Sequence, residues 1–397
     1  MSINIYEPVL YITIENKEVA KDISDDIINF SYEDVTDKMD ELRLTILDAE
    51  MVHIDDPMLQ EGKEIKAKWG YVNNLSEIRT CTIKEIEYDF PDGGDPTITI
   101  VAYDKGHNLT GRAARTVWKN KTVADIVRDI AGKHKLKPVV QIPEDPPRAF
   151  VSQGGKNDME FLLKLADEVG CVLKIKNTEL SFAPAADGGA VVKFIYRAEP
   201  DGYLKNMQIK SDAEQGKGAA SETTAPGIDP ATGKPFAPKS DASQSKYLVN
   251  MKDGSEKRET KRDSKHDETG AVAVSTAETA KEAENAAKRK AGSSVKDAIK
   301  ADIETIGLPY LCAGMTITID NIGKKFSGDW KIVSVRHIID DNGYTCDIEA
   351  TKKDIGKKSD SKSAGANTNK EAGAGSNAPT ASDKKNTITV DLKKEGE

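Results

Sequence analysis

Cysteine is scarce in this chain, whose 397 residues contain 4. The four lie far apart in the sequence, so no C-x-x-C pair is present, and this spacing argues against a structural zinc site. Most of them lie in apolar strand contexts, which favours buried, reduced thiols over disulfides. They are Cys81, Cys171, Cys312 and Cys346.

Long apolar runs are also missing. No stretch approaches the length of a transmembrane helix, and the first residues, MSINIYEPVLYI, lack the basic start and apolar core of a signal peptide. We therefore expect no membrane anchor and synthesis in the cytoplasm. Hydrophobic residues make up only 38% and mean hydropathy is -0.54. A composition this polar indicates that part of the chain has no core of its own.

Positive charge is in deficit, with Lys+Arg 57 against Asp+Glu 66 and a net charge of -9. A protein built to grip nucleic acid needs a basic footprint, so this balance argues against such a role. It suits a surface that DNA passes without sticking, because like charges repel. It is equally the balance of an ordinary soluble acidic protein.

Catalytic motifs are absent as well. The sequence has no H-E-x-x-H, no G-x-S-x-G and no phosphate-binding G-x-x-x-x-G-K-[ST]. Its 5 histidines are scattered, and His337 lies in an apolar strand pattern that favours a packed, hydrogen-bonded side chain. We therefore predict no enzyme, no catalytic or metal-binding residue and no cofactor. Carboxylates are plentiful, so a pair suited to glycan hydrolysis stays open as an alternative.

The N-terminal part of the chain has the pattern of a β-domain. Short alternating runs are separated by turn clusters such as PDGGDP (91–96). Ile83 lies on one parity and Ile86 on the other, which predicts a bulge. Because closure removes exposed strand edges, residues 1–117 are predicted to form a β-barrel or sandwich.

The next segment, 118–184, is predicted to be a small α/β insert. Thr122 with Asp125, and Asn157 with Glu160, are capping pairs that begin two amphipathic helices. Gly170 supplies the stop of the second helix. A hairpin turning at residues 177–178 follows.

The remainder alternates between strands and polar segments. Residues 185–212 and 304–352 are predicted to build a second β-domain, whose residues 314–350 read as a three-stranded meander with an Asp-Asn-Gly turn. The polar stretch 213–268 is predicted to be a flexible loop or extended arm. Residues 269–303, rich in Ala, Glu and Lys, are predicted to be helical. The segment 353–397 is a low-complexity tail.

Three ordered landmarks resemble one known family. They are RTVWKNKTVADIVRDIA (115–131), QGGKNDMEFLLKLADEVG (153–170) and GMTITIDNIGKKFSGDWKIVSVRHIIDDNGYT (314–345). Together they resemble the late control D family, which contains the baseplate hub of phage tails and the hub part of type VI secretion spikes. The matching motif positions, taken as structural residues, are Trp118, Asp125, Asp158, Phe161, Leu162, Leu165, Gly170, Gly314, Phe326, Gly328, Trp330, His337 and Tyr344.

The resemblance implies a mainly β fold with two tube-like β-barrel domains plus a small α/β domain. We expect Trp330 to plug the second barrel and Trp118 to hold the insert on the first. The resemblance further implies a homotrimer in the virion tail baseplate, or in a related injection particle. It would contact the tail tube, the central spike, wedge or sheath-associated proteins and a tape measure protein in its lumen, while DNA or cargo passes.

Two other readings stay open. One is a tail-associated protein that binds or hydrolyses peptidoglycan, with the α/β insert as its binding module. The other is a free-standing cytoplasmic β-protein unrelated to tails. Self-association discriminates, since the hub reading requires a trimer and the enzyme reading requires turnover.

Overall fold

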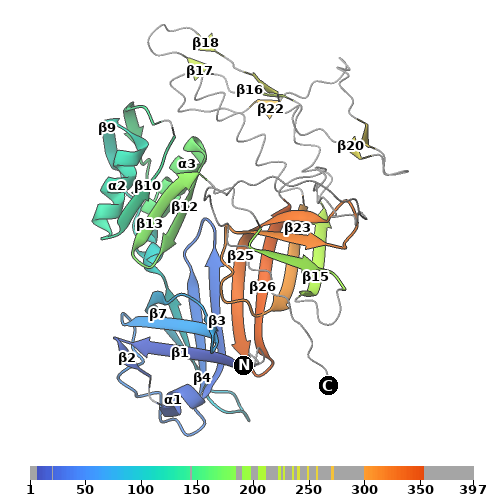
Figure 1. Ribbon diagram of the computed structural model, residues 1–397. Helices are drawn as coiled ribbons and strands as arrows, with labels where there is room; N and C mark the ends of the chain where they lie inside the picture. The colour runs from blue at the N-terminus through green and yellow to red at the C-terminus, as the bar shows by residue number, and fades with distance from the viewer. Residues whose placement is uncertain are drawn as a thin grey trace, which may run out of the picture. The chain divides into compact units, whose positions relative to one another are not determined.

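The computed structural model describes residues 7–19, 21–143, 145–184, 190–197, 204–211 and 299–352, together with the backbone of short strands between 222 and 271 (Figure 1). Its dominant feature is one 14-stranded sheet, ordered β15-β23-β26-β25-β3-β4-β8-β7-β5-β1-β2. Strands β14, β24 and β6 pair beside this path. The prediction of a mainly β protein is confirmed.

The first strand region supplies one half of this sheet. Its alternating sequence places every second side chain in the core, as in β4, whose residues are alternately buried and half-buried. The strands are β1 (Pro8–Ile14), β2 (Lys17–Glu18), β3 (Ile27–Val35), β4 (Glu41–Leu47), β5 (Glu64–Tyr71), β6 (Asn74–Leu75), β7 (Arg79–Asp89) and β8 (Thr97–Tyr103), with α1 (Lys21–Asp25) and the 3-10 helix η1 (Lys105–Thr110). The expected bulge is present, because the β7–β8 register shifts between Ile83 and Glu85.

The second strand region supplies the other half. Its strands are β14 (Val192–Ile195), β15 (Leu204–Ser211), β23 (Ile299–Ile306), β24 (Thr316–Asp320), β25 (Gly328–Asp340) and β26 (Gly343–Lys352). The expected meander is confirmed, since β24, β25 and β26 pair antiparallel in sequence order. Strand β25 also pairs with β3, so blue and orange strands that are far apart in sequence lie side by side in Figure 1.

The α/β insert has its own core. Its elements are β9 (Val117–Lys121), α2 (Val123–Lys133), β10 (Lys137–Val140), β11 (Arg148–Ser152), α3 (Asp158–Val169), β12 (Cys171–Lys176) and β13 (Glu179–Pro184). Both helices begin with the expected capping boxes, at Thr122 and Asn157, and Gly170 ends α3 in the left-handed conformation. The β12–β13 hairpin turns where predicted, with Asn177 at φ 55.

No closed barrel is found among the described residues, where the main strands follow a single path from β15 to β2, so the two-barrel layout stays a prediction. One core cluster accordingly includes side chains of both strand regions, such as Trp69 and Trp330. The helix expected over 269–303 is wrong at its C-terminal end, where Ile299, Ala301 and Ile303 are the buried positions of strand β23.

The polar stretches contribute little that is described. Short strands there are β16 (Glu222–Thr224), β17 (Gly227–Ile228), β18 (Pro235–Phe236), β19 (Lys239–Asp241), β20 (Leu248–Val249), β21 (Glu256–Lys257) and β22 (Gly270–Ala271). The rest of the expected loop at 213–268, most of the expected helix and the tail at 353–397 lie outside the described residues.

Candidate functional site: the buried junction of the strand regions and the insert

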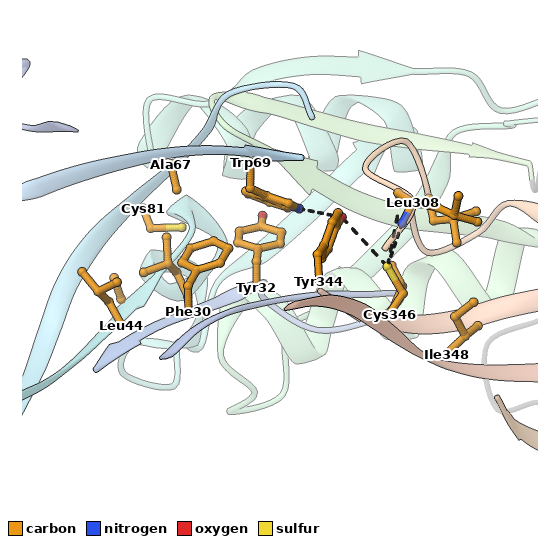
Figure 2. Close-up of a cluster of buried hydrophobic side chains, with 14 of the residues drawn as sticks. Phe30, Tyr32, Leu44, Ala67, Trp69, Cys81, Leu308, Tyr344, Cys346 and Ile348 are labelled. Atoms are coloured by element: carbon orange, nitrogen blue, oxygen red, sulfur yellow. Dashed lines mark hydrogen bonds between the residues drawn. The ribbon is translucent and has the colours of Figure 1, made fainter. Parts of the chain in front are cut away.

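A chain of aromatic rings crosses the place where the two strand regions meet. Trp69 on β5 lies with its ring centroid 5.2 Å from Phe30 and 4.9 Å from Tyr32, both on β3. On the other side its ring is 5.2 Å from His337 of β25. The Trp69 indole N–H donates to the Tyr344 hydroxyl at 3.1 Å, a bond drawn in Figure 2. These aromatic contacts bind β5, β3, β25 and β26 into one body.

His337 is a fully satisfied core histidine. Its Nε2 lies 3.2 Å from the Leu311 carbonyl, which can only accept, so Nε2 carries the proton. Its Nδ1 therefore accepts from the Tyr344 hydroxyl at 2.7 Å. Burial lowers the pKa of His337 to about 4, which keeps the ring neutral. The buried Cys346 thiol lies 3.2 Å from the same Nδ1 and is not in a disulfide.

Tyr344 is fixed on its other face by a glycine. A Cβ placed on Gly307 would lie 2.0 Å from Tyr344 Cδ1, so the ring packs directly on the Gly307 backbone. The Gly307 N–H also donates to the Tyr344 carbonyl at 2.8 Å. Only glycine fits this contact, which explains a glycine in an otherwise apolar turn.

A buried ionic cluster joins the insert to both strand regions. Asp34 on β3, fully buried, accepts from Arg79 of β7 at 3.2 Å and from Lys174 of β12 at 3.0 Å. The Lys174 ammonium also donates to the Ala313 carbonyl at 2.9 Å. One carboxylate thus ties together β3, β7, β12 and the turn before β24. Removing either cation would leave a buried charge less well paired.

A second carboxyl, Asp40, lies beside this cluster. It accepts from the Tyr32 hydroxyl at 2.7 Å and from the Val35 N–H at 3.2 Å. Burial, and next the charge of Asp34, raise the pKa of Asp40 to about 7. Burial likewise raises the pKa of Asp104 well above its usual range. Asp40 is thus bonded within the junction, whereas Asp104 caps η1 by accepting from the Gly106 N–H at 2.9 Å, and its buried Oδ2 has no hydrogen-bond partner among the described residues.

The β12–β13 turn provides the second attachment of the insert. Asn177 accepts from the Thr80 N–H at 3.0 Å and donates to the Ile78 carbonyl at 3.3 Å. Beside it, Lys176 forms an ion pair with Glu77. The insert is therefore fastened to the start of β7 by directional bonds as well as by the Lys174 ammonium.

The motif residues predicted from sequence fall into two separate groups. The first lies in the core and caps of the insert. Trp118 stacks on Phe161, with ring centroids 5.4 Å apart, within this core. The expectation was that Trp118 packs against the first strand region, whereas its ring partner belongs to the insert itself. Asp158 accepts from His134 at 2.7 Å and from Gln153 at 2.6 Å. The remaining members are Asp125 in the α2 capping box, the core residues Leu162 and Leu165, and the C-cap Gly170.

The second group lies in the second strand region. Trp330 is fully buried and donates its indole N–H to the Phe326 carbonyl at 3.0 Å. The Lys352 ammonium caps the same carbonyl at 2.9 Å and lies over the Trp330 ring. Gly314 and Gly328 have φ values of 85 and 119, which glycine adopts without strain. His337 and Tyr344 complete the group at the junction.

Sequence reasoning missed the ionic cluster. One signal was available, because Phe30, Tyr32 and Asp34 share a parity in β3, and a carboxylate on a core-facing parity requires a buried partner. Lys174 carried no signal, since it lies opposite the buried face of β12. Among the described residues no group of His, Cys, Asp and Glu could hold a metal ion. No helix there is long and apolar enough to cross a membrane.

Solved structures share this fold at low sequence identity. The 43 kDa tail protein of prophage MuSo2 from Shewanella oneidensis matches with a TM-score of 0.66 and 14% identity, covering 87% of this chain and 98% of that one. A tail protein from Neisseria meningitidis MC58 matches with a TM-score of 0.66 and 13% identity, covering 88% of this chain and 98% of that one. The E. coli c3393 protein matches with a TM-score of 0.54 and 12% identity, covering 85% of this chain and 76% of that one. It is described as a type VI secretion system component with structural similarity to T4 tail proteins. These likenesses define the class of fold as that of tail proteins.

The family follows from the sequence itself. The family model of the phage tail baseplate hub (GPD) matches residues 56–343. The chain belongs to the phage tail baseplate hub family, and the resemblance stated from its three landmarks is confirmed. It is therefore a structural protein of the tail-hub kind, related to phage tails and contractile injection systems. Comparison with curated protein sequences finds no match.

Proposed function

We propose that this chain forms a homotrimeric hub that adapts the sixfold tail tube to the threefold central spike. In this proposal residues 1–117 form one tube-like domain, residues 185–212 with 304–352 form a second, and residues 118–184 form the insert between them. Three copies would then present six near-equivalent strand regions to the tube and three identical faces to the spike.

One observation carries this proposal most directly. Strand β25 pairs with β3 over seven residue pairs, from Ser334 opposite Val35 to Asp340 opposite Asn29. Backbone pairing and the shared core make the two strand regions one stiff body. A symmetry adaptor needs this property, because two positions of a ring must keep a fixed angle while the tail contracts or ejects its contents.

The partners follow from the same arrangement. The tail tube protein would contact the side of the ring that presents six strand regions, and the spike would contact the side with three identical faces. Wedge or sheath-associated proteins would contact the outside of the ring. The lumen would admit the tape measure protein and then DNA or cargo, and the net charge of -9 supports passage without binding. The assembled protein would reside in the virion tail baseplate or an equivalent particle.

The alternative function, hydrolysis of peptidoglycan by a tail-associated protein, finds no support in the titratable groups. Catalytic carboxylates with raised pKa values line clefts that admit substrate. Here the carboxyls with the most strongly raised pKa values, Asp40 and Asp104, are 2% and 3% exposed, and each accepts a hydrogen bond from the protein. They have the environment of structural groups.

Electron microscopy of the hub bound to its spike and tube proteins tests the proposal. We expect class averages in which a ring of three chains has six similar lobes on the tube side and three on the spike side. A complex with one or two copies per spike would overturn the symmetry-adaptor function.

A further inference from the structure

A rigid loop after β4 presents apolar side chains to solvent. The buried Asp48 carboxylate accepts from the N–H groups of Val52 at 2.8 Å, His53 at 3.0 Å and Ile54 at 3.0 Å. Met51 is held at φ 55, a conformation that non-glycine residues seldom adopt. Met51 and Val52 are nevertheless 55% and 59% exposed. The fold thus fixes this loop without burying its apolar residues.

The end of the neighbouring β7–β8 hairpin also exposes apolar side chains. After the bulge at Ile83–Glu85, Tyr88 and Phe90 share a parity, and they are 42% and 56% exposed. The Asp48 N–H donates to the Pro96 carbonyl at 2.8 Å, which places the loop against this hairpin end. Met51, Val52, Tyr88 and Phe90 together are called the tip patch below.

The tip patch has an acidic border at the hairpin turn, where Asp92 and Asp95 are exposed and residues 91–96 contain no basic side chain. Glu85, Glu87 and Asp89 alternate with Ile86 and Tyr88, so they project from the opposite face of the strand, where Glu87 pairs with Arg43 at 3.9 Å. An apolar patch with a border of one charge sign is typical of a surface made for a partner of the opposite sign.

The insert exposes a surface of the opposite kind on the β9–β11 pair. Trp118 and Val151 face inward, whereas Phe150, opposite Lys119, and Val117, opposite Ser152, face outward. Phe150 is 57% and Val117 44% exposed. Residues 112–121 contain four exposed basic side chains and no acidic one, namely Arg112, Arg115, Lys119 and Lys121. Val117, Phe150 and these four bases are called the ribbon patch.

We propose that the tip patch of one copy binds the ribbon patch of the next copy. Both patches are exposed in the same chain, so neither covers the other, while their apolar centres and opposite borders match. Such a contact joins two different surfaces and is head-to-tail, and repeated contacts of this kind close a ring. The inference rests on the proposed homotrimer and assigns to it a specific interface between copies.

Charge reversal on one side at a time tests the contact. The tip variant carries Asp92→Lys and Asp95→Lys, and the ribbon variant carries Lys119→Glu and Lys121→Glu. All four side chains are exposed, so thermal unfolding should stay near that of the wild type. Each variant should associate at least about tenfold more weakly, because the repelling borders face each other. Asp341→Lys, in the exposed β25–β26 turn, is the matched control and should associate normally.

Two further samples make the result specific. A chain carrying both reversals should recover association, since its borders are again opposite. In an equimolar mixture the tip and ribbon variants should bind each other, because the lysines introduced into the tip of one copy meet the glutamates introduced into the ribbon of the other. A ring of three cannot alternate the two variants, so light scattering should show mixed pairs in place of single copies.

The outcomes separate this contact from the homotrimer on which it rests. A wild type of three copies that is unaffected by either reversal would leave the ring in place and overturn this contact. A wild type that stays a single copy at every concentration would overturn both. Failure of the doubly reversed chain to recover association, with folding intact, would also contradict the charge matching.

Discussion

Two buried groups at the junction should give the folded protein opposite responses to pH. The pKa of Asp40 is raised from 3.8 to about 7, so between these values the folded state holds a proton that the unfolded state releases. Stability should therefore fall as pH rises through this range. The pKa of His337 is lowered from 6.5 to about 4, so below 6.5 the unfolded state binds a proton that the folded state refuses. Its contribution to stability should rise with pH.

The magnitudes follow from the two displacements. One pKa unit corresponds to about 1.4 kcal/mol, so ionised Asp40 lowers the free energy of unfolding by about 4 kcal/mol above pH 7. Protonated His337 lowers it by about 3 kcal/mol below pH 4, because the buried ring must then carry a charge. The two slopes oppose each other between about pH 4 and 6.5. Removing His337 should expose the slope of Asp40, and removing Asp40 should leave the slope of His337 together with that of Asp104, whose pKa burial also raises.

The substitution Asp40→Asn tests this reasoning. Its amide oxygen can accept from the Val35 N–H, and its amide N–H can donate to the Tyr32 hydroxyl oxygen, so both bonds are kept, one with reversed direction, while the charge is lost. Denaturant unfolding from pH 4 to 8 should show a variant whose advantage over the wild type grows by about 4 kcal/mol across that range. Asp92→Asn, in an exposed turn, is the control and should change stability by less than about 0.5 kcal/mol throughout. A flat difference curve for Asp40→Asn, or one of opposite sign, would refute the argument.

Further substitutions test the packing and the ionic cluster. Gly307→Ala should lower the free energy of unfolding by about 3 kcal/mol, because its Cβ would overlap the enclosed Tyr344 ring. The double variant with Tyr344→Ala should lose less stability than the sum of the two single losses, and full additivity would contradict the contact. Lys174→Met should destabilise by about 2 kcal/mol by leaving Asp34 with one cation, and should speed proteolysis within the insert. Lys176→Met, whose ion pair with Glu77 is exposed, should change stability by less than about 1 kcal/mol; an equal effect of both would show that burial is not the cause.

Much of the fold could be predicted from local patterns. Alternation identified the β24–β26 meander, and side-chain caps marked the starts of α2 and α3. The sequence predicts the end of a helix where strand β23 begins, because an Ala-, Glu- and Lys-rich stretch precedes the strand and its own alternation spans only eight residues. Local propensity dominated that interpretation, whereas pairing with β15 and β26 decides the structure.

The junction could not be predicted, for a different reason. Pairing of β3 with β25 joins residues about 300 positions apart, and nothing in either strand specifies the other. The bond from Lys174 to Asp34 depends on where the insert lies, so it leaves no trace in the spacing of residues. The predicted motif residues, in contrast, are caps, glycines and core aromatics, which local patterns do specify.

The mass of the purified protein in solution, by light scattering with and without its spike and tube proteins, tests the hub account most directly. The account predicts three copies per particle, either alone or once the spike is added. A single copy that ignores both proteins at every concentration would contradict it.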